Sequence, residues 1–338
     1  MKNAEGSKET VREAEWWRFE GEDVRCMLCP HVCLISPGTA GRCGVRIHVK
    51  GEGLRLSNYG MAASFAADPI EKKPLYHWKP GTSVLSLGSV GCSMHCPFCQ
   101  NWQLAECSAS VSLQRIAPED PARLAMQHGT PSVAFTYNEP LTWFEFLKDS
   151  CRLLREEKIP VVLVSNGMIN AAPLEEIVPY IAAANIDLKA FTPDAYRVMG
   201  GELDAVKRTI RTLSAAGTHV EVTFLLVPGI NDDAFSFAEM ASWLASLHPV
   251  PVLHISRYFP NREWRVPATP LERIKEFERI AQERLPWVYP GNIDGESSTR
   301  CLECGRVLLR RRRYTLLEKN IDEKGRCSFC ESPTPVTL

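Results

Sequence analysis

All but two of the thirteen cysteines in this 338-residue chain fall into three groups, and cysteine thiolates are ligands for metals and iron–sulfur clusters. An odd number of cysteines in close clusters fits a disulfide framework poorly, whereas short spacings in an intracellular protein are typical of metal sites. We assign the two others, Cys107 and Cys151, to packing. The groups are Cys26, Cys29, Cys33 and Cys43; Cys92, Cys96 and Cys99; and Cys301, Cys304, Cys327 and Cys330.

The central group has the spacing C-x3-C-x2-C within the segment Gly88–Trp102 (GSVGCSMHCPFCQNW). These positions would share one face of a helix, so buried free thiols on a helix are one interpretation. Gly91 and Pro97 disfavour a regular helix, and a loop that leaves a strand can aim all three thiolates inward. Three thiolates suit a four-iron cluster with one iron left open for a small ligand.

The two flanking groups have four cysteines each. Cys301-x2-Cys304 and Cys327-x2-Cys330 are separated by 22 residues, which predicts a tetrahedral site for structural zinc, with a rubredoxin-like iron as the alternative. The N-terminal spacing, C-x2-C-x3-C-x9-C, is less standard, and His31 lies within it as an alternative ligand. Zinc, an auxiliary iron–sulfur cluster and reduced thiols without a metal all remain open for that group.

The elements that must position the central cysteines alternate between short β-branched runs and longer helical stretches. We expect strands at 83–88, 132–137, 160–165, 185–190, 219–227 and 251–257. We expect helices at 118–128, 141–157, 172–183, 203–216, 233–247 and 270–284, and a short one near 97–105. This alternation implies parallel strands joined by right-handed crossovers, which a doubly wound sheet and an open (β/α)6 barrel both satisfy.

The pattern divides the chain into a polar tail (1–20), a cysteine-rich N-terminal module (21–81), an α/β domain (82–292) and a four-cysteine module (293–338) that is zinc-ribbon-like or rubredoxin-like. We see neither a secretory signal nor an apolar run long enough for a membrane helix. The formal net charge of -1 and the short basic run 310–313 make a weak case for nucleic acid. We therefore expect a cytoplasmic protein without membrane or nucleic-acid partners.

The central motif, with Phe98 before its third cysteine, resembles the signature of the radical S-adenosylmethionine (SAM) superfamily. The resemblance implies an open (β/α)6 partial barrel and a 4Fe-4S cluster whose open iron binds SAM. It further implies reductive cleavage of SAM to a 5′-deoxyadenosyl radical that abstracts hydrogen, with Phe98 near the adenine. Such an enzyme needs an electron donor, for which we expect a flavodoxin or a ferredoxin.

Other segments together resemble one subfamily, the radical SAM enzyme of the AmmeMemoRadiSam system, which is related to pyruvate formate-lyase activating enzymes. The resemblance covers nearly the whole chain from about residue 15 and implies Memo-like and AMMECR-like protein partners. The segments are Asp68–His77, Cys99–Trp102, Thr136–Pro140, Ser165–Gly167, Asn185–Lys189 and Val227–Asn231. Lys72 and Lys73 either bind an acidic substrate or partner or lie on a solvated face.

The resemblance also implies SAM contacts at the ends of the strands, where ligands of α/β proteins bind. Glu139 would accept hydrogen bonds from the SAM ammonium group, the alternative being a solvated acid or a helix cap. Asp187 and Lys189 would lie near the methionyl part of SAM, the alternative being a structural ion pair. The remaining expected contacts are Ser165, Asn166, the backbone of Gly229, and His254, with an ordinary turn or a core histidine as alternatives.

Three functions therefore compete. The first is a radical SAM enzyme of the AmmeMemoRadiSam type with an unidentified substrate. The second is an activase that takes hydrogen from a glycine of a partner enzyme; this chain lacks the two CxxCxxCxxxC runs of the activating enzymes with extra ferredoxin domains. The third is a non-catalytic protein that binds metal and RNA.

Overall fold

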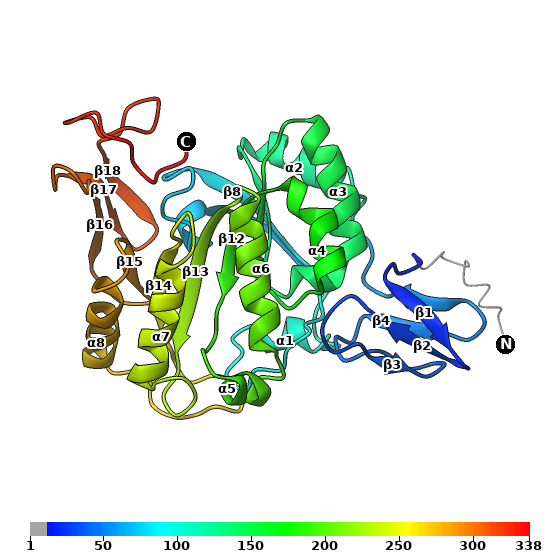
Figure 1. Cartoon of the computed structure of the whole chain (residues 1–338). Helices are drawn as coiled ribbons and strands as arrows, with labels where there is room; N and C mark the ends of the chain where they lie inside the picture. The colour runs from blue at the N-terminus through cyan, green and yellow to red at the C-terminus, as the bar shows by residue number, and fades with distance from the viewer. Residues whose placement is uncertain (1–11) are drawn as a thin grey trace.

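One eight-stranded sheet forms the centre of the computed structural model, which describes residues 12–338 (Figure 1). Its strands, in the order β15-β14-β13-β12-β11-β10-β8-β7, follow the chain without reversal. Every pair from β8 to β15 is parallel, and only β7 is antiparallel to its neighbour. The strands are β7 (Ser64–Pro69), β8 (Ser83–Gly88), β10 (Val133–Phe135), β11 (Val161–Ser165), β12 (Ile181–Asp187), β13 (His219–Leu226), β14 (Val252–Arg257) and β15 (Val288–Gly291).

This strand order decides between the two expected architectures. A doubly wound sheet reverses its order at a switch point, whereas here each new strand adds to the same side of the previous one. Such a sheet curls into a partial barrel with its crossover helices on the outside. The predicted open α/β barrel is therefore confirmed.

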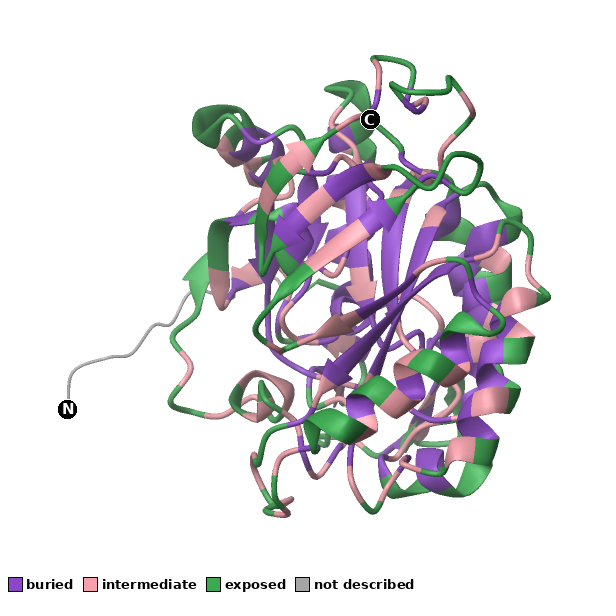
Figure 2. Cartoon of the chain, turned by 90° about the vertical axis from the view of Figure 1, so that its left-hand side faces the viewer, coloured by how far each residue is buried: buried purple, intermediate pink, exposed green. Residues whose placement is uncertain are grey.

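Amphipathic helices cover the outer face of this sheet, and Figure 2 shows buried strands beside helices with one buried and one exposed face. The buried sides of the helices and strands form one apolar core, to which Leu154, Ile210 and Phe277 contribute. The main helices are α2 (Asp120–His128), α3 (Phe144–Glu156), α4 (Ala171–Ile177), α6 (Leu203–Ala215), α7 (Ala234–Ala245) and α8 (Leu271–Gln282). The short ones are α1 (Trp102–Ala105), α5 (Pro193–Val198), η1 (Ile70–Lys72), η2 (Pro140–Trp143) and η3 (Val178–Tyr180).

The structure corrects three details of the expected elements. The predicted helix 172–183 ends as α4 and η3, and β12 already begins at Ile181, so the predicted strand 185–190 is placed too late. The alanines of this strand favour a helix locally, but its pairing with strands on both sides overrides that preference. The edge strands β7 and β15 were not expected, and β7 joins the main sheet from within the range assigned to the cysteine-rich module.

Small sheets, built mostly from the chain that precedes the barrel, lie beside it in Figure 1. The strand β1 falls inside the range expected to be a polar tail, while residues 1–11 of that tail lie outside the described residues. The strands are β1 (Trp17–Glu20), β2 (Asp23–Cys26) and β3 (Leu34–Ile35) in one sheet, β4 (Arg46–Val49) and β5 (Gly53–Leu56) in a second, and β6 (Met61–Ala62) with β9 (Gln114–Arg115) in a third.

The C-terminal module contains an antiparallel sheet of β16 (Glu296–Arg300), β17 (Val307–Arg312) and β18 (Thr315–Lys319). Arg311 of β17 is fully buried and donates a hydrogen bond to the carbonyl oxygen of Tyr76. Its guanidinium lies 4.6 Å from the centre of the Tyr76 ring. Thr337 donates to the carbonyl oxygen of His77 at 2.8 Å. The module is thus attached to the segment just before β8.

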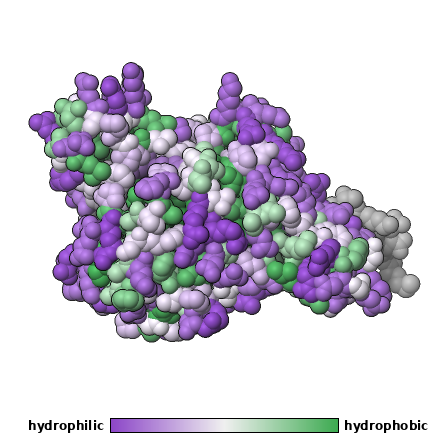
Figure 3. Space-filling model, in the orientation of Figure 1, coloured by the Kyte–Doolittle hydropathy of each residue, from purple (hydrophilic) through white to green (hydrophobic). Residues whose placement is uncertain are grey.

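No helix within residues 12–338 is long and apolar enough to cross a membrane. Figure 3 shows hydrophilic and hydrophobic side chains interspersed over the face in view.

Candidate active site

The three central cysteines lie on an irregular loop between β8 and α1. Gly91 has a φ of 95°, and a side chain there would lie 2.9 Å from the carbonyl oxygen of Cys43. This position therefore requires glycine for both its backbone angle and its close contact. The helix that the thiol spacing allowed is absent from this part of the described chain, so the loop interpretation is the correct one.

A cavity of about 1430 Å³ opens at the carboxyl ends of the parallel strands, and all three cysteines line it. Thr223 and Leu225 of β13 face it, as do His254 and Ser256 of β14, because alternate residues of a strand point to the same side. Of the eight predicted SAM contacts, seven line this cavity: Phe98, Glu139, Ser165, Asn166, Asp187, Lys189 and His254.

Glu139 connects the loops that follow β10 and β11. Its carboxylate accepts hydrogen bonds from the Ser165 hydroxyl at 2.7 Å, the Asn166 backbone N–H at 2.8 Å and the Leu141 backbone N–H at 3.0 Å. Burial raises its pKa to about 7 despite these donors. Glu139 is therefore a cavity-lining residue and also the cap of η2, which was the structural alternative.

Asn166 links this network to the cysteine loop. Its side-chain amide lies 3.6 Å from Cys92 Sγ and 3.3 Å from the Ser93 hydroxyl. Its carbonyl oxygen accepts from the Met168 backbone N–H, which fixes the orientation of the amide. A change in the loop after β11 would therefore alter the contacts of Cys92 directly.

Asp187 and Lys189 form an ion pair with a distance of 2.9 Å at the edge of the cavity. Asp187 ends β12 and Lys189 follows the strand, and the two side chains converge just past its end. Burial opposes the charged form of Lys189, but Asp187 and the cysteines Cys96 and Cys99 outweigh it and raise the pKa of the lysine. The ammonium group thus stays charged beside the cysteine loop.

Gly229 does not line the cavity that the other predicted contacts share. It has a φ of 80° in the loop after β13, and the indole of Trp264 lies 3.5 Å from where a side chain would begin. Trp264 donates from Nε1 to the Pro228 carbonyl oxygen at 3.1 Å. An indole is therefore packed across the loop at whose backbone we expected a SAM contact.

His254 faces the cavity, but its Nε2 lies 2.6 Å from the buried carboxylate of Glu221. Glu221 also accepts from the backbone N–H groups of Tyr76 and His77 at 3.0 and 2.8 Å. Burial opposes the ionised form of Glu221, yet hydrogen bonds from His219 and His254 outweigh it and hold the pKa well below its usual range. His254 is thus a hydrogen-bonded core residue in the floor of the barrel.

Comparisons with known proteins agree with this geometry. Residues 87–241 match the family described as the radical SAM superfamily, and this range contains the cysteine loop and the strands β10 to β13. The chain belongs to the radical SAM superfamily. It is 33% identical to an uncharacterized protein of Methanocaldococcus jannaschii over 97% of this chain and all of that one.

Two further similarities of this radical SAM protein are weaker. A pyruvate formate-lyase-activating enzyme of Staphylococcus epidermidis is 24% identical over 53% of this chain and 75% of that one. A crystal structure of a radical SAM methyltransferase from Sphaerobacter thermophilus is 18% identical, covers 62% of this chain and 66% of that one, and has a TM-score of 0.49.

Radical SAM membership implies a 4Fe-4S cluster and SAM, and the three central thiols fit the cluster. One ion at about 2.3 Å from each sulfur cannot hold sulfurs more than about 4.6 Å apart. Among the described residues, only the C-terminal group brings three or more potential ligand atoms within 4.8 Å of one another. Burial raises the pKa of Cys96 to about 11, so the free thiol is protonated at neutral pH and would lose its proton on binding iron.

Sequence reasoning missed Arg262, which comes from the loop after β14 and holds the cysteine loop in place. It donates from Nη1 to the carbonyl oxygen of Cys96 at 2.8 Å and pairs with Glu106 just after α1. Arg262 also lines the cavity. A single arginine in a loop carries no sequence signal that would separate it from a surface residue.

The segment Asp68–His77, whose role the sequence left open, lines the cavity and its floor. Asp68 accepts from Lys72 at 2.8 Å, and from Lys73 and Tyr137 at 2.7 Å each. Lys73 is buried and its ammonium lies 4.5 Å from the centre of the Tyr137 ring. Of the two lysines, only Lys72 is substantially exposed, so the solvated-face interpretation is wrong for Lys73.

The C-terminal cysteines form a compact set. Their sulfurs include two pairs at 3.7 Å, Cys301 with Cys330 and Cys304 with Cys327. Four sulfurs in a tetrahedron around an ion at about 2.3 Å would lie about 3.8 Å apart, so the set has the spacing of a single tetrahedral ion. Zinc and iron both accept this geometry.

Proposed function

We propose that this radical SAM protein cleaves SAM reductively and passes the radical to a substrate that enters the cavity from its open side. The observation that carries the proposal is the loop of Cys92, Cys96 and Cys99, which lines the large cavity together with Glu139 and Lys189. When bound, the cluster supplies the single electron that breaks a C–S bond of SAM and gives a 5′-deoxyadenosyl radical. The protein supplies binding groups and a shielded space for that reaction.

The residues around the loop have separate tasks in this proposal. Glu139 accepts hydrogen bonds from the ammonium of SAM, which requires its ionised form. Asn166 and Arg262 hold the two ends of the cysteine loop, at Cys92 and Cys96. The rings of Phe98 and Tyr258 pack edge-on, with 6.4 Å between their centres. In this proposal the apolar face of the Phe98 ring lies toward the adenine.

The decisive experiment is anaerobic reconstitution with iron and sulfide, followed by addition of SAM and dithionite. We expect release of 5′-deoxyadenosine from the wild-type protein and none from Cys96→Ala. Cys151→Ala is the matched control, because Cys151 is a buried thiol in α3 away from the cavity. No 5′-deoxyadenosine from wild-type protein with a fully loaded cluster would overturn the proposal.

We assign this enzyme to the AmmeMemoRadiSam system on the segments that carry the resemblance. Three of its Asp68–His77 residues, Pro74, Tyr76 and His77, contribute backbone groups to the hydrogen bonds of the barrel floor, which supports a role for that segment in shaping the substrate space. Memo-like and AMMECR-like proteins are the expected partners. A flavodoxin or ferredoxin is the expected electron donor, and free cysteines throughout residues 12–338 suit the reducing cytoplasm. Co-purification of tagged protein with the two partners, lost on denaturation, would test the assignment.

An activase is the second candidate, because the pyruvate formate-lyase-activating enzyme of Staphylococcus epidermidis is among the relatives. It predicts a glycyl radical signal on a partner enzyme after incubation with SAM and reductant. The charges of the basic run 310–313 are not available for RNA, which disfavours the RNA-binding alternative. Arg310, Arg312 and Arg313 pair with acidic side chains, and Arg311 is buried.

A further inference from the structure

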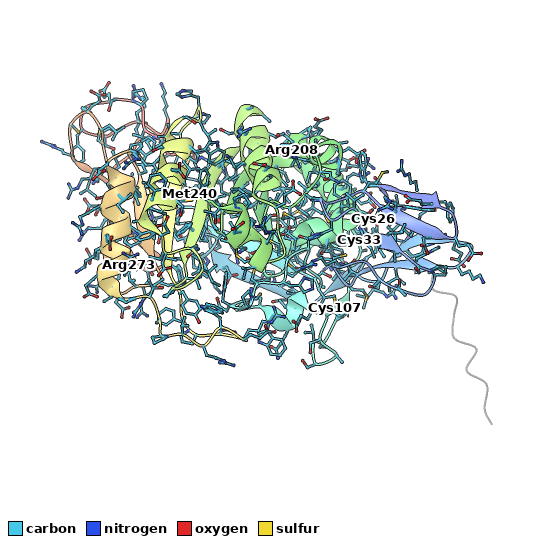
Figure 4. All side chains as sticks on the ribbon, turned by 60° about the horizontal axis from the view of Figure 1, so that its bottom comes forward. Cys26, Cys33, Cys107, Arg208, Met240 and Arg273 are labelled. Atoms are coloured by element: carbon cyan, nitrogen blue, oxygen red, sulfur yellow. The ribbon has the colours of Figure 1, made fainter. Side chains whose placement is uncertain are left out.

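The four cysteines of the N-terminal module surround one small cavity at the side of the barrel. Cys26 ends β2, Cys29 and Cys33 belong to the turn between β2 and β3, and Cys43 precedes β4. Figure 4 labels Cys26 and Cys33 where the small N-terminal sheets meet the barrel. The rest of the wall is largely apolar and includes Leu28, Ile35, Leu141 and Met168.

The spacing of these four sulfurs differs from that of the C-terminal set. No three of them lie within 4.8 Å of one another, although all four face the same cavity. One zinc ion would require every pair of its sulfur ligands to lie within about 4.6 Å. Four thiols that face one space but stand too far apart for one ion fit a larger centre, with the thiolates bound to different irons.

The wall of the cavity also contains two arginines. Arg46 is fully buried, forms an ion pair with the buried Glu145 and points Nη1 at Cys26 Sγ from 4.0 Å. Its buried Nε has no hydrogen-bond partner among the described residues, and Arg42 lines the same wall. Four thiolates carry more negative charge than the core of an iron–sulfur cluster neutralises, so a buried arginine stabilises the loaded site.

This cavity touches the SAM-cleaving loop. Ser93, the residue after Cys92, lines it, and the carbonyl oxygen of Cys43 lies against Gly91. His31, within the N-terminal group, lies 2.7 Å from the Ser93 carbonyl oxygen. Ser93 therefore lies between the two cysteine groups and contributes to the cavity of the first while following a ligand of the second.

We propose that Cys26, Cys29, Cys33 and Cys43 bind a second iron–sulfur cluster, of the four-iron type, directly beside the SAM-cleaving one. With one thiolate on each iron it has no vacant position, so it transfers electrons and does not bind SAM. A flavodoxin- or ferredoxin-class donor loses one electron to it, and this cluster then loses that electron to the central cluster. Zinc, the alternative that the sequence left open, does not fit these spacings.

The test uses a full-length chain in which Cys92, Cys96 and Cys99 are all alanine, so that the central cluster cannot form. After anaerobic reconstitution we expect about four iron and four acid-labile sulfide per chain to remain, besides the ion of the C-terminal site. Adding Cys29→Ser should abolish the sulfide, whereas adding Cys151→Ala should leave it unchanged. SAM cleavage is not measured, so this result is independent of the proposed activity.

Retained zinc without sulfide in the triple variant, or sulfide that survives Cys29→Ser, would overturn the proposal. If the triple variant fails to fold, iron and sulfide are compared between wild type and Cys29→Ser, with a loss of about half of each expected. In that single variant, SAM cleavage driven by a reduced flavodoxin should fall further than cleavage driven by dithionite. Equal losses would contradict the electron-transfer role.

Discussion

The central and C-terminal cysteine groups use the same side chain for different purposes. The C-terminal sulfurs pair at 3.7 Å and come from short turns beside one small sheet. The central sulfurs are spread more widely and line a cavity of about 1430 Å³. The CxxC spacing occurs in both groups, so the number of thiols and the space beside them distinguish a closed metal site from an open one.

The two groups also differ in what holds them. The C-terminal set is made by two local turns, and a serine hydroxyl, that of Ser332, lies 3.2 Å from Cys301 Sγ. The central loop depends on distant parts of the chain, namely Asn166 after β11, Arg262 after β14 and the close contact at Gly91. The contacts that shape the C-terminal set are therefore local, whereas those that shape the central loop come from distant parts of the barrel.

The largest effect expected from this contrast is at Cys96. Cys96→Ala removes one of the three proposed ligands, and we expect the remaining two thiols not to hold the cluster that the reaction needs. We expect 5′-deoxyadenosine formation to fall to background, while the C-terminal module keeps its ion. Product analysis and metal content on the same sample measure both. An active variant would show that the cysteine is not a ligand, and Cys151→Ala controls for loss of a buried thiol.

Cys327→Ala should have the opposite outcome. Losing one of the four proposed ligands would leave an incomplete tetrahedron, and binding energy at such sites is also folding energy. We expect the ion of this module to be lost and residues 293–338 to become sensitive to protease, while the central cluster still forms. Metal analysis and limited proteolysis measure the two effects. A protease-resistant module without metal would contradict the structural role.

Arg311→Ala tests how far the two regions are coupled. The guanidinium is fully buried and donates to the Tyr76 carbonyl oxygen and, at 3.2 Å, to the Thr299 hydroxyl. Its removal should lower the free energy of unfolding by about 2–4 kcal/mol, because buried polar partners lose their hydrogen bonds. Chemical denaturation measures this cost. We expect Arg311→Lys to recover only part of it, since one ammonium cannot reproduce the planar fork of donors.

Glu139→Gln should change how SAM affinity depends on pH. Because burial raises the pKa of Glu139 to about 7, the carboxyl is protonated below that pH and binds the SAM ammonium poorly. Affinity should then fall about tenfold per pH unit below 7 and level off above it. The folding stability depends on pH in the opposite direction, because the raised pKa of Glu139 favours the protonated form of the folded protein. This contribution to stability is present below the pKa of the unfolded state and is lost as the pH rises through about 7.

Equilibrium SAM binding between pH 5.5 and 8.5, a range of about three units around that pKa, measures the first effect. The glutamine variant should bind SAM with little pH dependence, and the exposed Glu283→Gln should behave as wild type. A wild-type affinity that does not change with pH would show that Glu139 does not meet the ammonium.

The alternation of apolar strands and helices predicted an α/β domain, and the resemblance to the radical SAM superfamily selected the barrel over a doubly wound sheet. Three cysteines with fixed spacing marked the central loop, because that pattern lies within a short stretch of sequence. Strand β12 was displaced because its alanines look helical until its neighbours in the sheet are known. The residues that hold the site, such as Arg262, could not be found because their contacts span up to 166 positions of the chain.

The histidine and glycine predictions show a second limit. His254 was placed on the correct face of its strand, but only the structure reveals that Glu221 occupies its Nε2. Gly229 has the turn geometry that its sequence indicates, while the indole of Trp264 covers it from another loop. A sequence pattern predicts the direction of a side chain, and only the tertiary structure shows which groups that side chain contacts.

The smallest expected effect is at Arg310, on the exposed side of the C-terminal sheet. Arg310 pairs with Glu318 at 2.9 Å and with Glu296 at 3.4 Å, and such exposed pairs contribute little to stability. Arg310→Ala should therefore shift the melting temperature by no more than about 2 °C and leave both metal content and SAM cleavage unchanged. Calorimetry, metal analysis and the assay for 5′-deoxyadenosine test these expectations. A large loss of SAM cleavage would mean that this module does more than hold Tyr76 in place, and the contrast between a closed structural site and an open reactive one would have to be abandoned.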